Sequence, residues 1–247
     1  MAKRTVSRKP RLYAPELPPR SQATDGQPVT LAPAASAHLA QVLRARPGDE
    51  VALFDGQGSE YLAQVETPDK RSCELRLGRL LRSGPPPRGH LHLLQAAIKS
   101  GLEGVIQQAT ELGATDIAIF RAERSAPASL RQDRAVRIAT GATEQSGRLF
   151  LPTVTMVDSF SAAIERATGE RLIALRGAAP LGAASDCDSA TIAIGPEGGF
   201  TDAEVEHALK ANFHPFGLGP LTLRAATAGP AAFASWHQLH AWREATT

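Results

Sequence analysis

The sequence predicts an α/β protein of two domains, a small N-terminal β-barrel at residues 1–84 and a larger α/β domain at residues 85–247. Short strand patterns dominate the first part, and strands alternate with helices in the second, which is typical of a largely parallel sheet. Between them, the segment SGPPPRG at residues 83–89 is typical of a stiff linker, because polyproline is excluded from helices and central strands. A chain of 247 residues that is 43% hydrophobic is long enough to bury both cores.

The expected barrel consists of a hairpin, a third strand and one short helix. Val51–Phe54 and Tyr61–Val65 flank the glycine-containing turn Asp55–Gly58, a pattern that predicts a β-hairpin. A further strand is expected at Ser72–Leu80. A helix expected at Ala37–Ala45 should end at the RPGD turn, because proline cannot continue a helix.

In the second domain, the apolar spacing predicts alternating strands and helices. The expected strands are Leu91–Ile98, Asp116–Phe120, Arg171–Arg176, Thr191–Gly195 and His214–Gly219. The expected helices are Ser100–Ala114, Arg131–Gly147, Ser159–Ala167 and a C-terminal helix that contains Trp236 and Trp242. These two tryptophans are expected to be core or dimer-contact residues, with base-stacking platforms as the alternative. Gly113 lies where a glycine usually ends a helix.

Cysteine and histidine usage indicates neither disulfides nor a metal site. Cys73 and Cys187 are far apart and lack metal-ligand spacing, which fits a reducing compartment. Two close pairs occur among the seven histidines, His90 with His92 and His237 with His240, and neither has an evident acidic or cysteine partner. The N-terminus lacks the apolar region of a signal peptide, and no stretch has 18 uninterrupted apolar residues. We therefore expect a cytoplasmic protein without a membrane span or bound metal.

Basic residues are concentrated in two stretches of a chain whose formal net charge is only +2. Residues 1–20 hold six lysines and arginines against one acid, and residues 121–148 hold six arginines against three acids. Such a local excess favours a face that contacts phosphate groups. The alternative is that these are ordinary solvated arginines.

The clearest candidate for a ligand site is the loop GPEGGF, Gly195–Phe200, which follows a predicted strand. In an open α/β sheet, ligands bind beyond the carboxyl ends of the strands, and glycines let the backbone approach them closely. Thr201 with Glu204 three residues later predicts a capping box, so a helix should begin at once. A second loop, Leu218–Arg224, also lies between a predicted strand and a helix. Either loop taken alone could be a mere strand-to-helix turn.

The carboxylate of Glu197 limits the classes of ligand that we expect this loop to bind. The GPEGG spacing fits neither the Rossmann nor the Walker pattern, and a carboxylate repels phosphate. A ligand with a positive centre and hydroxyl donors, such as S-adenosylmethionine (SAM), suits it better.

The two loops together carry a resemblance to a known family. IGPEGGFTDAEVEHA, followed by LGPLTLRAATA, resembles the bacterial small-subunit ribosomal RNA uridine N3-methyltransferase family of the knotted SPOUT superfamily. The stretches RLYAPE (Arg11–Glu16), HLAQVLRARPGDEVALFDGQG, IQQATELGA and TEQSGR resemble other parts of that family. The likeness covers nearly the whole chain.

The resemblance implies a PUA-like RNA-binding barrel, a catalytic domain with a deep trefoil knot, a homodimer, and SAM-dependent methylation of N3 of a uridine in small-subunit ribosomal RNA. The residues that would bind the cofactor are Leu175, Ile194, Gly195, Pro196, Glu197, Gly198, Gly199, Leu218, Gly219, Pro220 and Leu223. The residues that would bind RNA are Arg11, Arg44, Lys99, Arg124 and Arg148. Arg224 would be catalytic by stabilising anionic uracil at a carbonyl oxygen, with binding of a phosphate as the alternative role. Glu197 would shape its loop rather than act as a base.

The second loop departs from the family pattern, which usually reads LGPRILRTETA. Leu221, Ala225 and Ala226 replace an arginine, a threonine and a glutamate, whereas Arg224 and Thr227 remain. Two hypotheses follow: an active methyltransferase, or a non-catalytic relative that binds RNA.

Overall fold

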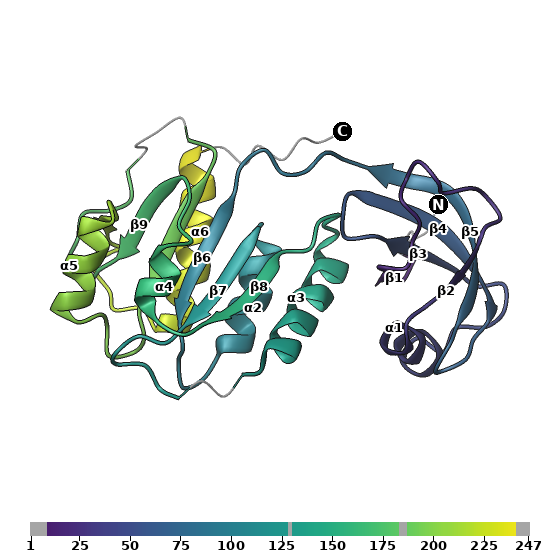
Figure 1. Ribbon diagram of the computed structural model, residues 1–247, viewed down its shortest axis with the longest axis horizontal. Helices are drawn as coiled ribbons and strands as arrows, with labels where there is room; N and C mark the ends of the chain where they lie inside the picture. The colour runs from purple at the N-terminus through teal and green to yellow at the C-terminus, as the bar shows by residue number, and fades with distance from the viewer. Residues whose placement is uncertain (1–8, 128–129, 183–186, 241–247) are drawn as a thin grey trace, which may run out of the picture. The chain divides into compact units, whose positions relative to one another are not determined.

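The computed structural model describes residues 9–127, 130–182 and 187–240 and divides into two compact units (Figure 1). The first unit comprises Met1–Pro86 together with Glu144–Leu151, and the second comprises Pro87–Thr143 together with Pro152–Thr247. The chain thus leaves the first unit inside the predicted linker and returns to it for one short segment. Trp242, expected in the last helix, lies outside the described residues.

The predicted small barrel is present in the first unit as a half-barrel. Its five-stranded sheet has the order β1-β3-β4-β5-β2, so β1 and β2 lie at the two edges. The strands are β1 (Arg11–Tyr13), β2 (Pro28–Thr30), β3 (Glu50–Phe54), β4 (Ser59–Thr67) and β5 (Glu74–Ser83). The short edge strands β1 and β2 were not predicted, because three residues are too few to show an alternating pattern.

The predicted hairpin is confirmed as the antiparallel pair β3 and β4. The carboxylate of Asp55 organises the turn, because its Oδ1 accepts hydrogen bonds from the backbone N–H groups of Gln57 and Ser59. This use of an aspartate side chain in a tight turn is common.

The predicted helix at Ala37–Ala45 is wrong in its bounds. Helix α1 (Pro33–Ala37) starts earlier and continues as the π-helical turn η1 (His38–Val42). Pro33 explains the earlier start, since proline is well suited to the first turn of a helix, where its missing N–H is not needed.

The second unit contains a six-stranded sheet in the order β11-β9-β10-β6-β7-β8, in which every pair is parallel. Its strands are β6 (Leu91–Ala96), β7 (Asp116–Phe120), β8 (Thr153–Val157), β9 (Glu170–Ala174), β10 (Ala190–Ile194) and β11 (His214–Phe216). Its helices are α2 (Leu102–Glu111), α3 (Gln132–Ser146), α4 (Phe160–Ile164), α5 (Asp202–Lys210) and α6 (Ala225–His240). The alternation predicts this parallel sheet correctly.

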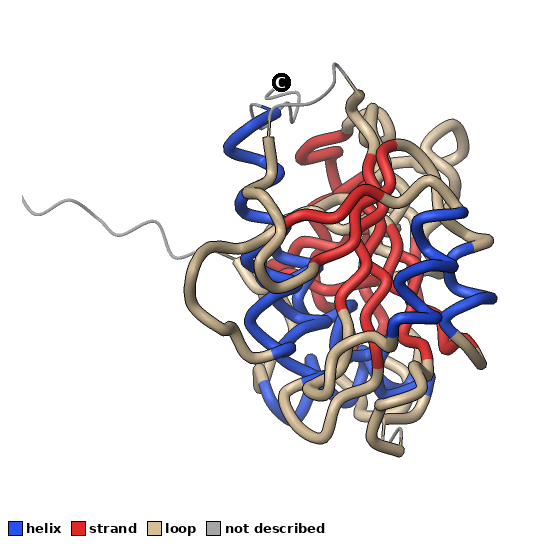
Figure 2. Tube along the Cα trace, turned by 90° about the vertical axis from the view of Figure 1, so that its left-hand side faces the viewer, coloured by secondary structure: helices blue, strands red, loops and turns tan. Residues whose placement is uncertain are grey.

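Helices cover both faces of this sheet, as Figure 2 shows. Buried side chains of α2, α3 and α6 pack on one face, and those of α4 and α5 pack on the other. Trp236, on α6, is 3% exposed and belongs to the first of these cores. The central strands β6, β7 and β10 are mostly apolar because both of their faces are buried.

In the second unit one strand was missed, one helix is shorter than expected, and the knot is not tested. Strand β8 was not predicted, since it lies at the edge of the sheet and only one of its residues is fully buried. Helix α4 is shorter than the expected Ser159–Ala167. The trefoil knot stays a prediction.

Within the described residues, no helix is long and apolar enough to cross a membrane. No three histidine, cysteine or acidic residues in the described ranges are grouped so as to hold a metal ion. Instead, His92 is buried in the sheet, which lowers its pKa, and the ring of His237 lies 2.6 Å from the Leu112 carbonyl oxygen.

Candidate functional site

The two loops singled out in the sequence lie at the same edge of the second sheet. All strands of that sheet are parallel, so their carboxyl ends share one edge. We call Gly195–Phe200, which follows β10, the glycine loop, and Leu218–Arg224, which follows β11, the rim loop. The sheet order places β10 directly beside β6, so the β6–α2 connection, residues 97–101, joins the same edge.

Glu197 ties the glycine loop to the β6–α2 connection. Its Oε1 accepts a hydrogen bond of 2.8 Å from the backbone N–H of Lys99. A carboxylate is a strong acceptor for such a bond. The acid among the glycines therefore shapes the loop, as the resemblance implies, and its engaged oxygen is not placed to act as a free base.

Arg124 holds the glycine loop from the other side. Its Nη1 donates to the carbonyl oxygens of Gly198, at 3.2 Å, and of Phe200, at 3.5 Å. Arg124 belongs to the segment that follows β7, so the ends of three strands are linked.

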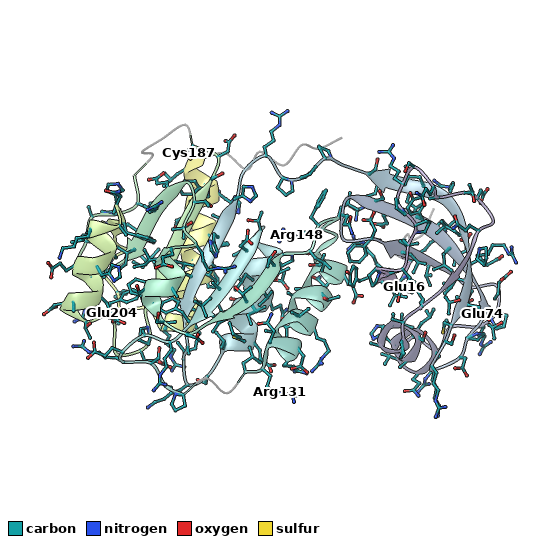
Figure 3. All side chains as sticks on the ribbon, viewed as in Figure 1. Glu16, Glu74, Arg131, Arg148, Cys187 and Glu204 are labelled. Atoms are coloured by element: carbon teal, nitrogen blue, oxygen red, sulfur yellow. The ribbon has the colours of Figure 1, made fainter. Side chains whose placement is uncertain are left out.

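Glu204, labelled in Figure 3, adds a further tie. The predicted capping box is confirmed, with the Thr201 side chain accepting from the Glu204 N–H and the Glu204 carboxylate accepting from the Thr201 N–H. The second oxygen of Glu204 accepts from the backbone N–H of Glu123 at 2.9 Å. One carboxylate thus caps α5 and fixes the segment that carries Arg124.

The glycines of this loop serve two different purposes. A Cβ on Gly195 would lie 3.1 Å from the ring of Phe200, which stacks among Phe120 and Phe160. Gly195 therefore lets the loop pack tightly. Gly199 has a φ of +70°, and a Cβ there would meet nothing within 4 Å, so it leaves open space in a backbone conformation that favours glycine.

The rim loop is more open. It follows Gly217, whose N–H donates to the Ala179 carbonyl oxygen. The N–H of Leu175 donates to the carbonyl oxygen of Phe216. These bonds bring Leu175 beside the start of the rim loop. Gly219 has a φ of +105° with nothing within 4 Å of its Cβ position.

Departures from the family pattern lie on and just after the rim loop. Leu221 is 77% exposed, and Arg224 is exposed immediately before α6. Ala226 lies against the β6–α2 connection, since a Cβ on Gly101 would be 3.0 Å from the Ala226 Cβ. The β6–α2 connection therefore contacts both the glycine loop, through Lys99, and the helix that the rim loop enters.

Arg11, one of the predicted RNA contacts, is buried and makes contacts within the protein. Its side chain is 7% exposed and pairs with Glu60 at 2.9 Å, and its guanidinium lies 3.8 Å from the centre of the Phe54 ring. It also donates to the carbonyl oxygens of Glu144 and Arg148. Burial lowers the pKa of Arg11, and the bond to Glu60 opposes that shift. Arg11 holds the segment Glu144–Leu151 in the first unit.

The other predicted RNA contacts lie nearer the surface. Arg44 and Lys99 are exposed, and Arg148, labelled in Figure 3, is partly exposed. Several neighbouring arginines are ion-paired instead: Arg131 and Arg137 with Asp133, and Arg134 with Glu103. The arginines of α3 are therefore partly neutralised by their own neighbours.

Sequence reasoning missed the linking roles of Arg124 and Glu204. Each bonds to a backbone group more than seventy residues away, and no sequence spacing indicates such a pair. The only hint is that a capping-box glutamate has a second carboxylate oxygen available.

Comparison with known proteins decides the family. The RNA methyltransferase domain family matches residues 85–237, which is more than half of the chain, and the RNA methyltransferase PUA domain family matches residues 31–78. The chain belongs to the RNA methyltransferase family. Its relatives include ribosomal RNA small subunit methyltransferase E of Synechocystis sp., 33% identical over 85% of this chain and 73% of that protein. The same enzyme of Bacillus subtilis is 30% identical over 77% of this chain and 82% of that protein.

Two solved structures are similar to this chain over nearly their whole length. Ribosomal RNA small subunit methyltransferase E from Neisseria gonorrhoeae, bound to S-adenosyl methionine, has a TM-score of 0.80 and 30% identity over 94% of this chain and 98% of that chain. A Legionella pneumophila protein, Lpg2936, solved with the bound cofactor SAM, has a TM-score of 0.83 and 28% identity over the same shares. The resemblance carried by the two loops is thus confirmed at the level of the family and its fold.

Proposed function

We propose that this protein transfers a methyl group from SAM to N3 of a uridine in small-subunit ribosomal RNA. The observation that carries the proposal is the glycine loop. It follows a central strand, it is held in place by Glu197 and Arg124, and it leaves open space at Gly199. Family membership and the SAM-bound relatives support this assignment.

The residues at this edge fit the cofactor. Gly199 and Gly219 each leave room where a side chain would intrude, one in each loop. The proposed contacts are the eleven residues predicted from the sequence. Seven are Leu175 and residues 194–199, and the other four are Leu218, Gly219, Pro220 and Leu223 of the rim loop. When bound, SAM supplies an electron-poor methyl group on sulfur.

Arg224 is the residue that we assign to the reacting base. Uracil N3 lies on the Watson–Crick edge, so the base must be unpaired or flipped out before it can react. N3 must lose its proton to solvent water, and the negative charge that remains spreads over the neighbouring carbonyl oxygens. The exposed Arg224 is suited to donate hydrogen bonds to one of these oxygens, and such preorganised donors supply much of the catalysis in comparable sites.

Lys99 in the second unit, and Arg44 and Arg148 in the first, are proposed to contact RNA phosphates. Arg11 is left out because its guanidinium is buried and engaged, and Arg124 is reassigned to the glycine loop. We also propose that the protein acts as a homodimer in the cytoplasm, where ribosomal subunits assemble. Light scattering on a sizing column measures its mass directly against the 26.1 kDa of one chain.

The test is methyl transfer from labelled SAM to small ribosomal subunits of a strain that lacks this protein, with the product nucleoside identified by mass spectrometry. We expect 3-methyluridine at one position. Another methylated nucleoside would overturn the assignment to uracil N3. If the protein binds the RNA but transfers no methyl group, the replacements at Leu221 and Ala226 have removed turnover, and the non-catalytic hypothesis holds.

A further inference from the structure

The segment that follows β9 carries an arginine that the proposed chemistry does not use. Strand β9 lies between β10 and β11 in the sheet, so the residues after it emerge between the glycine loop and the rim loop. Leu175, the first of these residues, is one of the proposed cofactor contacts, and Arg176 comes next. Its place between the two loops makes Arg176 a candidate for a role in the reaction.

A tight turn fixes the backbone of Arg176. The Ala178 N–H donates to the Leu175 carbonyl oxygen at 3.3 Å, which closes a four-residue turn with Arg176 and Gly177 at its centre. Gly177 has a φ of +81°, the conformation that a type II turn requires at its third residue. We call residues 175–178 the β9 turn.

Further bonds hold the β9 turn against the start of the rim loop. The Gly217 N–H donates to the Ala179 carbonyl oxygen at 2.7 Å, and the Leu175 N–H donates to the Phe216 carbonyl oxygen at 2.9 Å. A Cβ on Gly217 would lie only 2.3 Å from the Ala178 carbonyl oxygen, so the two segments approach as closely as a glycine allows. The backbone that carries Arg176 is therefore held in place before any ligand arrives.

The side chain of Arg176 reaches the rim loop. The residue is exposed, and its Nη1 donates to the Thr222 hydroxyl oxygen at 3.3 Å. In the part of the chain that the structure describes, Arg176 makes no ion pair, unlike Arg134 and Arg137 of α3. A guanidinium has five N–H donors, so most of those of Arg176 remain available to a ligand from solvent.

The rim loop itself is short of positive charge. Its own sequence supplies one cation, Arg224, because Leu221 stands where the family pattern has an arginine. Arg176 brings a guanidinium to Thr222, the residue next to Leu221, from a different segment of the chain. The rim loop therefore has two guanidinium groups, one of its own and one held against it by the β9 turn.

We propose that Arg176 is a substrate-positioning residue that binds a phosphate group beside the target uridine. It supplies from the β9 turn the positive charge that the rim loop lacks at Leu221. Guanidinium groups bind phosphate through two parallel hydrogen bonds, which fix orientation as well as position. With the phosphate held by Arg176, Arg224 is left to the carbonyl oxygen of the base. This inference rests on the proposed function, because it takes ribosomal RNA as the substrate.

The first experiment measures methyl transfer and RNA binding by Arg176→Ala. The KM for small ribosomal subunits should rise about tenfold with kcat nearly unchanged, because the phosphate contact is made equally before and during the reaction. The salt dependence of RNA binding, measured by filter binding, should fall by about one phosphate contact. Arg166→Ala is the matched control, since Arg166 is an exposed arginine that precedes β9, at the opposite edge of the sheet. Equal effects of the two variants would overturn the proposal.

The second experiment returns the charge to the rim loop itself. Arg176→Ala combined with Leu221→Arg should recover most of the RNA affinity that Arg176→Ala loses. Leu221→Arg in the otherwise unaltered protein should gain little, because Arg176 already supplies a guanidinium there. If Leu221→Arg raises RNA affinity by the same factor in both backgrounds, the two positions act independently and the proposal fails.

A third measurement separates the phosphate from the cofactor. Arg176 follows a proposed cofactor contact, Leu175, and the carboxylate of SAM is also an anion. Calorimetry should show that Arg176→Ala binds SAM as the unaltered protein does. A loss of SAM affinity would assign Arg176 to the cofactor and overturn its phosphate role.

Methyl transfer by the unaltered protein tests the proposed function separately. If that protein methylates subunits and Arg176→Ala binds RNA as Arg166→Ala does, only the assignment of Arg176 fails. If it transfers no methyl group but Arg176→Ala still binds RNA more weakly than Arg166→Ala, the proposed function fails and the phosphate contact stands.

Discussion

The glycine loop and the rim loop each join a strand to a helix, but they are held very differently. The glycine loop is fixed by Glu197, by Arg124 and by the capping box that follows it. The rim loop receives a hydrogen bond of 3.3 Å from Arg176 to the Thr222 hydroxyl, and its central leucine is 77% exposed. The fixed loop offers the cofactor a preformed wall, whereas the open loop combines its proposed cofactor contacts with two exposed side chains, Leu221 and Arg224, that a large partner can reach from solvent. Variants of the glycine loop and of the exposed Arg224 should therefore affect different steps.

The largest effect is expected from Gly199→Val. The new side chain would fill the open space of the glycine loop, so SAM binding should fall more than a hundredfold by calorimetry. A β-branched residue at a φ of +70° also costs about 1–2 kcal/mol of stability. Gly48→Val is the matched control, because Gly48 has a φ of +91° with nothing within 4 Å and lies in the first unit. If both variants bind SAM like the parent, the glycine loop is not the cofactor wall.

Arg224→Ala should separate the rate of methyl transfer from SAM affinity most clearly. We expect kcat to fall about a hundredfold, the usual cost of losing one donor to developing negative charge. SAM affinity should change less than twofold, because Arg224 lies beyond the glycine loop. Single-turnover kinetics and calorimetry measure the two quantities. A parallel loss of SAM affinity would contradict the assignment of Arg224 to the reacting base and not to the cofactor.

Glu197→Ala removes the acceptor of the Lys99 N–H, so the glycine loop loses its tie to the β6–α2 connection. A hydrogen bond to a charged group contributes about 1.5 kcal/mol, which corresponds to roughly tenfold in SAM affinity. Glu197→Gln keeps an acceptor oxygen and should recover part of that affinity. Equal losses for Ala and Gln would indicate that the charge, rather than the bond to Lys99, is what matters.

The smallest effect is expected from Arg124→Ala, which removes the bonds to the Gly198 and Phe200 carbonyl oxygens. SAM affinity should fall about threefold to fivefold, since bonds of this length at an exposed side chain contribute at most about 1 kcal/mol. The salt dependence of RNA binding should not change. Arg131→Ala is the control, because Arg131 is 80% exposed and does not touch the loop. A reduced salt slope with normal SAM affinity would restore Arg124 as an RNA contact.

Local patterns predicted those parts of the structure that depend on neighbours in the chain. The hairpin around Asp55–Gly58, the capping box at Thr201 and the glycine after α2 are all confirmed. Each depends on backbone geometry within a few residues, and specific residue types indicate it. The short edge strands β1 and β2 could not be predicted, because their partners β3 and β5 lie far along the chain. The early start of α1, in contrast, has a local signal in Pro33.

The sequence by itself determined two kinds of fact about this protein. It placed glycines and a carboxylate after a buried strand, and it carried the family resemblance, since both depend only on which residues follow one another. Tertiary structure alone decided the roles of the charged side chains. Arg11 was predicted on a surface and is buried against Glu60, and Arg124 was predicted to bind RNA and holds the glycine loop. The reason is that the partner of a charge is chosen by the distance between atoms in the folded chain, and sequence separation does not report that distance.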